Sequence, residues 1–169
     1  MSRSRQQTAD DDARHLRRAV QLALEAEARG DLPVGTVLTL GGEVVAEAGN
    51  AVLQPVYHPG RHAEVEALGQ VPASLWPRAR ELTCYTTLEP CVMCAGALLL
   101  HGVGRVVFGA RDPLGGAGPV LTRLPAYYEG GAGVPEWVGP AMPELCDPLF
   151  RRVLERFDDL PAGRNNFQK

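Results

Sequence analysis

The stretch "LTCYTTLEPCVMCAGALLLHGVGRVVFGA", Leu82 to Ala110, decides the fold. It begins with a run rich in threonine and tyrosine (82–88), continues through an apolar segment (91–100) and ends with a β-branched run (105–110). The first and last runs favour strands, whereas the middle segment has the length and apolar character of a buried helix. A strand, a helix and a second strand in this order are typical of a parallel crossover. The sequence therefore predicts an α/β fold.

Upstream of this stretch, the sequence predicts a hairpin flanked by two helices. Residues 33–40 and 43–50 are rich in β-branched and apolar residues, and the Gly-Gly pair between them favours a tight turn. Apolar residues at helical spacing predict a helix over 12–30 before the hairpin and a short helix over 62–69 after it. Together with the crossover, these segments supply four strands.

The length of 169 residues suits a single domain with one well-buried core. We expect this domain to cover residues 11–160 and to end in a helix over 147–158, which an Asp-Pro pair begins. Residues 111–140 contain seven glycines and five prolines, which predicts a long loop. Residues 1–10 are polar and lack hydrophobic periodicity, so we expect a disordered tail there and a flexible tail over 161–169.

The charge balance and the four cysteines limit the classes of function. Seventeen basic and twenty acidic side chains give a net charge of -3, which argues against a large basic surface for nonspecific nucleic-acid binding. No apolar run approaches the roughly 20 residues that span a bilayer, and the N-terminal segment has no apolar signal sequence. We therefore expect a cytoplasmic protein that does not bind membranes. Two of the cysteines form "CVMC", which in such a chain favours metal or redox chemistry over disulfides.

The segments "HAE" (62–64) and "PCVMC" (90–94) together predict a catalytic zinc site. Cys91 and Cys94 are three residues apart at the start of a predicted helix, so their thiolates project to the same side and can hold one ion. With His62 they give three ligands and leave the fourth tetrahedral position open for water, as in catalytic zinc sites. A thiol redox protein, in which "CVMC" is a reactive pair, is the alternative from another class.

Glu64 follows His62 by two residues, so its carboxylate can point at a metal-bound water without binding the metal. There it can take a proton from the water and pass it to a ring nitrogen of the substrate. The pattern HxE followed by PCxxC is the signature of zinc deaminases. We therefore predict a zinc-dependent hydrolytic deaminase, in which the zinc-bound water attacks the amine-bearing carbon of a nucleobase and ammonia leaves.

These motifs resemble the zinc-dependent cytidine and deoxycytidylate deaminase superfamily, and in particular its tRNA-specific adenosine deaminase branch. The resemblance rests on "LPVGTVL", "GN", "HAE", "TLEPCVMCAGAL" and "GRVVFGARD", which follow the order and spacing of that branch. It implies a three-layer α/β/α fold, in which helices cover both faces of a mixed five-stranded sheet, and a homodimer.

The resemblance also implies roles for single residues. His62, Cys91 and Cys94 would be the ligands of a Zn²⁺ cofactor, and Glu64 would be the catalytic proton carrier. The residues that it implies at the substrate are Asn50, Ala63, Pro33, Val34 and Pro90.

Several positions depart from the tRNA-editing pattern. Ala51 stands where that branch usually carries a basic residue, and Gly60 and Arg61 stand where it usually carries a pair of small residues. With the acidic charge balance and the altered sequence after Gly118, these departures favour a free base, nucleoside or related amino-heterocycle as the substrate. The alternative is adenosine at the wobble position of a tRNA anticodon loop, which would become inosine. A further alternative is a noncatalytic zinc-binding partner subunit, whose pocket is blocked by Arg61 or by the long loop.

Overall fold

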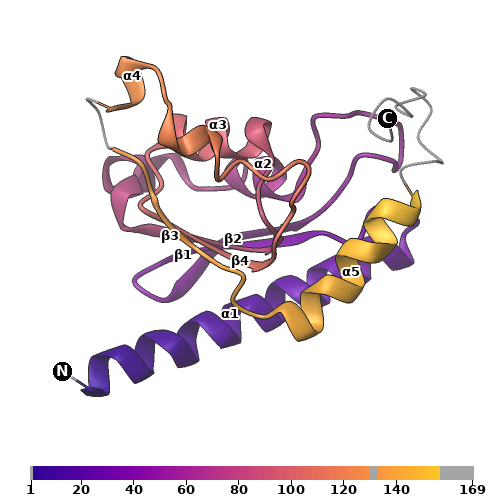
Figure 1. The fold of residues 1–169 in the computed structure, drawn as a ribbon, viewed down its shortest axis with the longest axis horizontal. Helices are drawn as coiled ribbons and strands as arrows, with labels where there is room; N and C mark the ends of the chain where they lie inside the picture. Colours follow the sequence, from indigo (N-terminus) through magenta and orange to yellow (C-terminus); the bar gives the residue numbers. More distant parts are fainter. Residues whose placement is uncertain (1, 130–132, 157–169) are drawn as a thin grey trace.

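The computed structural model describes residues 2–129 and 133–156 and contains one mixed sheet between two layers of helices (Figure 1). β1 pairs antiparallel with β2 and with β3, whereas β3, β4 and β5 run parallel to one another. The strand order is β2-β1-β3-β4-β5, which confirms the predicted α/β fold with a five-stranded sheet. The strands are β1 Gly35–Leu40, β2 Glu43–Gly49, β3 Leu82–Leu88, β4 Arg105–Ala110 and β5 Glu136–Val138.

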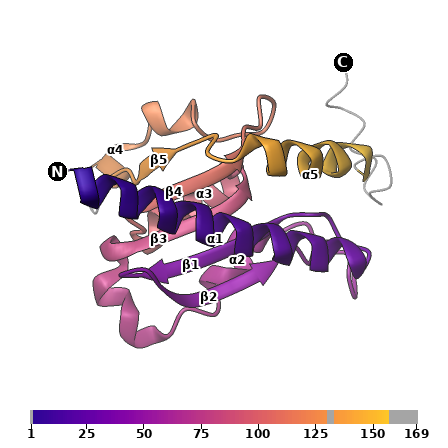
Figure 2. The same ribbon diagram turned by 90° about the horizontal axis from the view of Figure 1, so that it is seen from below.

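Helices cover both faces of this sheet. On one face lie α1 (Ser2–Ala28) and α5 (Pro143–Arg156), and on the other lie α2 (Ala63–Leu68) and α3 (Val92–His101) (Figures 1 and 2). Because α3 connects the parallel strands β3 and β4, the predicted crossover is confirmed. The connections contain a further short helix and two 3₁₀ segments: α4 Ala126–Glu129, η1 Ala73–Glu81 and η2 Val120–Thr122.

Two apolar clusters fill the spaces between the sheet and its helical layers. Successive residues of a strand point to opposite faces, so Leu38 packs with Leu98 of α3 while Val37 packs with Leu16 of α1. Both β1 residues are fully buried, as expected for an inner strand that is covered on both faces.

The N-terminal helix begins at Ser2, so the predictions of a disordered tail over 1–10 and of a helix start at residue 12 were wrong. The packed part of α1 nucleates the helix, and each further residue adds a backbone hydrogen bond at little cost. Gln6 also donates a side-chain hydrogen bond of 3.0 Å to Asp10 one turn further on. This polar stretch has no apolar periodicity, which is why the sequence did not reveal its helix.

The C-terminal helix also begins earlier than predicted, at Pro143 instead of residue 147. Proline is favourable at the first helical position because it has no N–H group to leave unpaired. The buried side chain of Cys146 lies in the same cluster as Met142, so packing against the sheet starts before the predicted Asp-Pro pair. The predicted end at 158 and the tail over 161–169 lie outside the described residues.

The fifth strand lies inside the predicted loop over 111–140. β5 has only three residues, of which Trp137 pairs with Val106 of β4. Within the described part of this segment the regular elements are all short, in keeping with its many glycines and prolines. Among residues 2–129 and 133–156, no helix combines the length and the apolar character needed to cross a bilayer.

Candidate active site

The starts of two helices on the same face of the sheet bring the predicted metal ligands together. His62 immediately precedes α2, Cys91 immediately precedes α3, and Cys94 lies in the first turn of α3. His62 Nδ1 is 3.6 Å from Cys91 Sγ and 3.5 Å from Cys94 Sγ, and the two sulfur atoms are 3.6 Å apart. His62 and the two cysteines, which lie about thirty positions further along the chain, therefore form one compact cluster.

The geometry of this cluster fits a zinc ion. Zinc binds cysteine sulfur at about 2.3 Å and histidine nitrogen at about 2.0 Å, which places the ligands of a tetrahedral ion about 3.5 to 3.8 Å apart. The three observed separations agree with these values. Within the described part of the chain, the cluster has no fourth histidine, cysteine or carboxylate ligand, so one position of a tetrahedral ion stays open. That arrangement is typical of catalytic zinc.

The two thiols of the cluster differ in their protonation. A hydrogen bond with Cys94 and a weaker contribution from His62 lower the pKa of Cys91 to about 4, against the opposing effect of burial. The hydrogen bond with Cys91, together with burial, raises the pKa of Cys94. The lowered pKa of Cys91 favours its thiolate, which is the form that binds zinc.

The carboxylate of Glu64 lies beside this cluster and is buried, with 3% of the residue exposed. Its Oε1 accepts a hydrogen bond of 3.0 Å from the Thr86 hydroxyl, and its Oε2 is 3.4 Å from Cys94 Sγ. Thr86 in turn accepts a hydrogen bond of 3.1 Å from Thr36. Burial raises the pKa of Glu64, which makes its carboxylate a better proton acceptor than an exposed one.

Neither threonine was among the predicted site residues. Thr36 and Thr86 are partners across the β1–β3 pair, and both are fully buried. The sequence offered only a weak signal, namely polar residues within strands that are otherwise apolar. Buried hydroxyls need hydrogen-bond partners, and here Glu64 is the final acceptor.

The residues predicted to contact the substrate are buried in the structure. Asn50 is buried at the end of β2, and its backbone N–H donates a hydrogen bond of 2.9 Å to the carbonyl of Val34. Val34 packs in one apolar cluster with Ala63, the first residue of α2. Pro33 and Pro90 are also buried. Their roles toward a substrate stay predictions.

Asp31, which was not predicted, holds Asn50 in place. The carboxylate of Asp31 is 1% exposed, and its Oδ1 accepts a hydrogen bond of 2.7 Å from Asn50 Nδ2. The sequence signal was only a lone aspartate after the glycine that follows the first helix.

Glu89, which directly precedes Pro90 and Cys91, binds the long loop over 111–140 through hydrogen bonds. Its buried carboxylate accepts hydrogen bonds from the backbone N–H groups of Asp112 and Gly118, and from the Trp137 indole. A Cβ atom at Gly118 would lie 2.8 Å from Glu89 Oε1, so only glycine allows this approach. Segment 112–118 consequently lies against Pro90 and Cys91, where Ala117 N–H donates to the Pro90 carbonyl and Gly116 bridges to Cys91.

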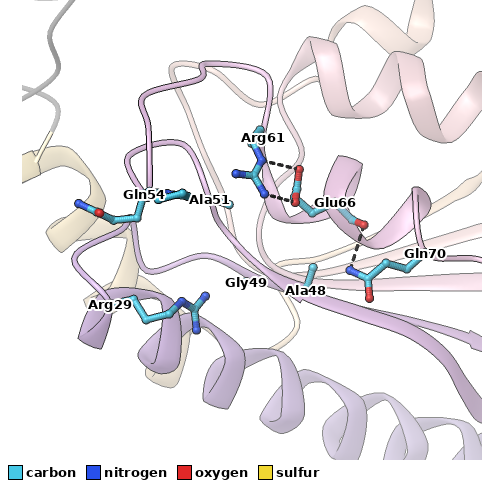
Figure 3. Close-up of a pocket in the computed structure, with 9 residues that line it drawn as sticks. Arg29, Ala48, Gly49, Ala51, Gln54, Arg61, Glu66 and Gln70 are labelled. Atoms are coloured by element: carbon cyan, nitrogen blue, oxygen red, sulfur yellow. Dashed lines mark hydrogen bonds and ion pairs between the residues drawn. The ribbon is translucent and has the colours of Figure 1, made fainter.

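The side chain of Arg61 forms an ion pair with Glu66 of α2. Its guanidinium donates hydrogen bonds of 3.1 and 2.9 Å to the Glu66 carboxylate. Both residues line an open cavity of about 560 Å³ together with Arg29, Gln54 and Gln70 (Figure 3). Arg61 is thus held by Glu66, and this ion pair gives no support to the hypothesis that Arg61 blocks the metal site.

Comparison with known proteins decides the family. Residues 9–110 match the family model described as the cytidine and deoxycytidylate deaminase zinc-binding region, and this range contains all three metal ligands and Glu64. The chain belongs to this deaminase family. It is therefore a zinc-binding enzyme of the class that cleaves C–N bonds by hydrolysis, as the sequence predicted.

Several relatives are described as tRNA-specific adenosine deaminases. The tRNA-specific adenosine deaminase of Bacillus subtilis (strain 168) is 40% identical over 115 residues, which cover 67% of this chain and 70% of that protein. The enzyme of the same description from Haemophilus influenzae (strain ATCC 51907 / DSM 11121 / KW20 / Rd) is 41% identical over 109 residues, 63% of this chain and 62% of that protein. With tRNA-specific adenosine deaminase 2 of Danio rerio, the match covers 52% of the relative. Apart from the first, these matches span about half to two thirds of the relatives' lengths.

Two solved structures give the same fold with different substrates in their descriptions. One comes from work on A-to-I editing by tRNA:A34 deaminases at the wobble position, with 31% identity, a TM-score of 0.64, and coverage of 75% of this chain and 96% of that one. The other is guanine deaminase from Bacillus subtilis, with 32% identity, a TM-score of 0.52, and coverage of 59% and 64%. The family deaminase fold is thus established for this chain, and the choice of substrate is a separate question.

Proposed function

We propose that this zinc deaminase converts adenosine to inosine at the wobble position of a tRNA anticodon loop. The observation that carries deamination is the placement of Glu64 beside the cluster of His62, Cys91 and Cys94. The observation that favours tRNA is that relatives 40% and 41% identical to this chain are described as tRNA-specific adenosine deaminases. This reverses the preference for a small substrate that charge and local departures had suggested.

Each residue of the site has its own role in the proposed reaction. A Zn²⁺ ion held by His62, Cys91 and Cys94 would supply a polarised water that is nucleophilic at neutral pH. Glu64 would take one proton from the attacking water and pass it to the ring nitrogen beside the reacting carbon. It would carry the second proton of that water to the amine, so that, once the carbon–oxygen bond has formed, the carbon–nitrogen bond breaks and ammonia leaves. Asn50 orients the base against this machinery, and Pro33, Val34, Ala63 and Pro90 shape the surrounding wall.

A free purine base is the second candidate. The guanine deaminase neighbour is 32% identical to this chain, and the net charge of -3 is unusual for a protein that holds RNA phosphates. If the substrate is a free base, the enzyme should act equally well at low and at high salt.

We also propose a cytoplasmic homodimer. The outer face of α3 exposes 55% of Val92, 42% of Met93 and 63% of Leu100, and an added Cβ atom at Gly96 would meet nothing within 4 Å. An apolar, flat helical face of this kind suits a second copy of the same helix. All four cysteines are free, which fits a reducing compartment. Sedimentation of wild type and Leu100→Glu tests the assembly, since the charged side chain should shift dimer to monomer.

The experiment that tests the activity is ammonia release from a panel of substrates at fixed salt. The panel contains guanine, adenine, adenosine, cytidine and an anticodon stem-loop with adenosine at the wobble position. We expect turnover of the stem-loop, with loss of at least about a hundredfold in Glu64→Gln while its zinc content stays at the wild-type level. Turnover of guanine alone would establish the second candidate. Absence of turnover on every member would instead favour the noncatalytic partner subunit.

A further inference from the structure

Asp31 binds one segment of the chain through an unusual number of hydrogen bonds. The residue lies between α1 and β1, is 1% exposed, and accepts five hydrogen bonds, all from N–H groups. One donor is the Asn50 side chain, at 2.7 Å from Oδ1. The other four are the backbone N–H groups of Leu32 at 2.8 Å, Val52 at 3.2 Å, Leu53 at 3.0 Å and Gln54 at 2.9 Å.

This carboxylate fixes the orientation of the Asn50 amide. The two ends of an asparagine amide have nearly the same shape, but only the NH₂ end can donate. Asp31 acts purely as an acceptor, so the NH₂ end of Asn50 must face it. The amide oxygen and the second N–H of Asn50 are then the groups of this side chain that can meet a substrate.

The Asn50 amide is also tied to the metal ligands through the backbone. Asn50 N–H donates to the Val34 carbonyl, and the N–H of Ala51 donates to the carbonyl of Arg61, which precedes His62. Two backbone hydrogen bonds thus connect Asn50 with the wall of the site and Ala51 with the residue before the first metal ligand. A displacement of segment 50–54 would consequently move Asn50 relative to the zinc.

We propose that Asp31 is a positioning residue that selects the substrate base through Asn50. Asp31 forces the amide to present one acceptor and one donor at the same time. That pair matches a base edge that offers an amine N–H beside a ring nitrogen acceptor, as adenine does with N6 and N7. This inference rests on the proposed action on adenosine. It assigns Asp31 a role in choosing the base, whereas the chemistry stays with Glu64 and the zinc ligands.

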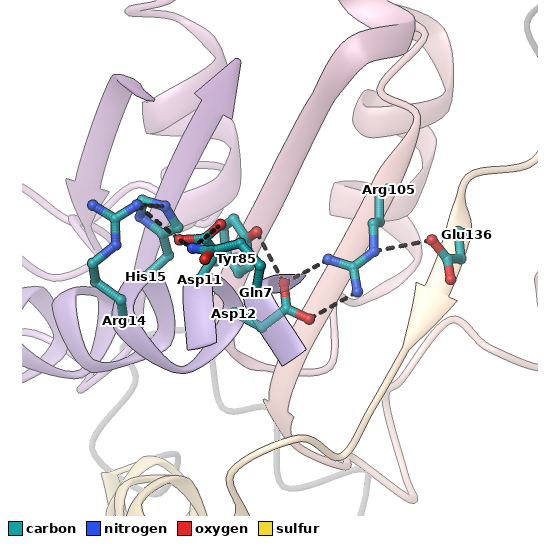
Figure 4. A network of polar contacts seen from close by, with 8 residues as sticks. All are labelled: Gln7, Asp11, Asp12, Arg14, His15, Tyr85, Arg105 and Glu136. Carbon is teal, nitrogen blue, oxygen red and sulfur yellow. Dashed lines mark hydrogen bonds and ion pairs between the residues drawn. The ribbon is translucent and has the colours of Figure 1, made fainter. Parts of the chain in front are cut away.

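The variant Asp31→Asn isolates this role because it keeps the shape and changes only the hydrogen-bonding pattern. Its NH₂ group would oppose N–H groups that donate to Asp31 in wild type, and it could donate to the amide oxygen of a flipped Asn50, so Asn50 would no longer present one fixed pair. Asp12→Asn is the matched control. Asp12 is a partly buried carboxylate of α1 that accepts hydrogen bonds from the Tyr85 hydroxyl and from Arg105 (Figure 4).

The test compares stem-loops that carry adenosine or 7-deazaadenosine, which lacks the N7 acceptor, at the target position. We expect wild type and Asp12→Asn to prefer adenosine by about tenfold in kcat/KM, the effect of one good hydrogen bond. In Asp31→Asn this preference should fall to about twofold or less, while zinc content is unchanged. An unchanged preference in folded, zinc-loaded Asp31→Asn would overturn the proposal.

A second measurement is independent of turnover and of any variant. In the wild-type ¹⁵N–¹H spectrum, one of the two Asn50 side-chain protons should exchange slowly with solvent and shift downfield, because it is bonded to Asp31. Rapid exchange of both protons would overturn the role of Asp31 directly. If wild type deaminates neither stem-loop, the proposed substrate fails, and this spectrum alone decides whether Asp31 orients Asn50.

Discussion

The hydroxyl of Thr86 donates a hydrogen bond of 3.0 Å to Glu64 Oε1 in a fully buried part of the sheet. Thr36 donates to Thr86, so a short chain of hydroxyls leads from β1 to the Glu64 carboxylate. Since Oε2 lies on the side of Cys94, the hydroxyl chain holds one oxygen while the other faces the metal site. Thr86 is therefore expected to position Glu64 without touching the substrate.

Thr86→Val removes this hydroxyl and keeps the shape of the side chain. We expect kcat to fall about tenfold with little change in KM, because Glu64 loses one hydrogen bond but the substrate pocket is unaltered. Thr86→Ser, which keeps the hydroxyl, should recover most of the rate. Steady-state kinetics of the two variants would contradict this role if valine were as active as serine.

The metal ligands lead to a prediction about zinc content and stability. A zinc ion bound by His62, Cys91 and Cys94 joins the starts of α2 and α3, so binding should stabilise the folded state. Cys94→Ser is expected to lose most of its zinc and to melt at a lower temperature. Strong chelators should lower the Tm of wild type in the same direction.

Cys84→Ala is the control for this experiment, because Cys84 is equally buried but lies outside the ligand cluster. It should lose some stability through the cavity it leaves, yet retain one zinc per chain by atomic absorption. Full zinc content in Cys94→Ser would remove Cys94 from the ligand set.

The central part of the fold could be predicted because its signals are local. The limits of β3 and β4 agree with the predicted ranges, since each strand is an unbroken run of β-branched or apolar residues between a helix and a turn. The metal ligands were also predictable, because one histidine and two cysteines in this spacing pattern seldom serve another purpose than binding a metal. For the strands, the sequence within about ten residues contains the whole cause, whereas the ligand pattern extends over residues 62–94 and is recognised by its residue types.

The features that escaped prediction depend on contacts between distant segments. β5 is only three residues long and is a strand because β4 offers it an open edge. Asp31 and Asn50 are separated by 19 positions, and nothing in the local sequence of either residue indicates the other. Thr86 resembles any strand threonine until the carboxylate of Glu64 is placed beside it. Pairings of this kind follow from the fold and cannot be deduced from periodicity.

A polar network ties α1 to three strands and should contribute to stability. The Asp12 carboxylate accepts hydrogen bonds of 2.7 and 2.8 Å from Arg105, which also donates to Glu136 of β5, and the Tyr85 hydroxyl donates to Asp12 (Figure 4). Asp12 and Arg105 side chains are only 16% and 20% exposed, so solvent screens this pair less than a surface pair.

Asp12→Asn removes the charge but leaves a side chain of the same size. We expect the free energy of unfolding to fall by about 1 to 3 kcal/mol, because the half-buried Arg105 loses its ionic partner. Urea unfolding measures this difference. Glu81→Gln, which breaks the exposed pair with Arg78, should leave stability unchanged, and equal effects of the two substitutions would show that burial does not strengthen the network.

The buried imidazole of His15 makes stability depend on pH. His15 is 3% exposed, and its ring centroid lies 4.9 Å from that of Tyr85. Burial, aided by the positive charge of Arg14, lowers the pKa of His15 below its usual 6.5, and the opposing effects of Asp11, Asp12 and the Gly42 backbone are smaller. The folded state therefore binds a proton less readily than the unfolded chain.

Because the unfolded chain takes up this proton first, wild type should lose stability as the pH falls below about 6.5, and the loss should level off below the folded pKa. In His15→Gln this contribution is absent. The difference in unfolding free energy between wild type and His15→Gln should thus shift against wild type between pH 7 and pH 5, as measured by urea unfolding at each pH. Parallel curves for wild type and His15→Gln would mean that the buried ring accepts its proton as easily as it does in the unfolded chain.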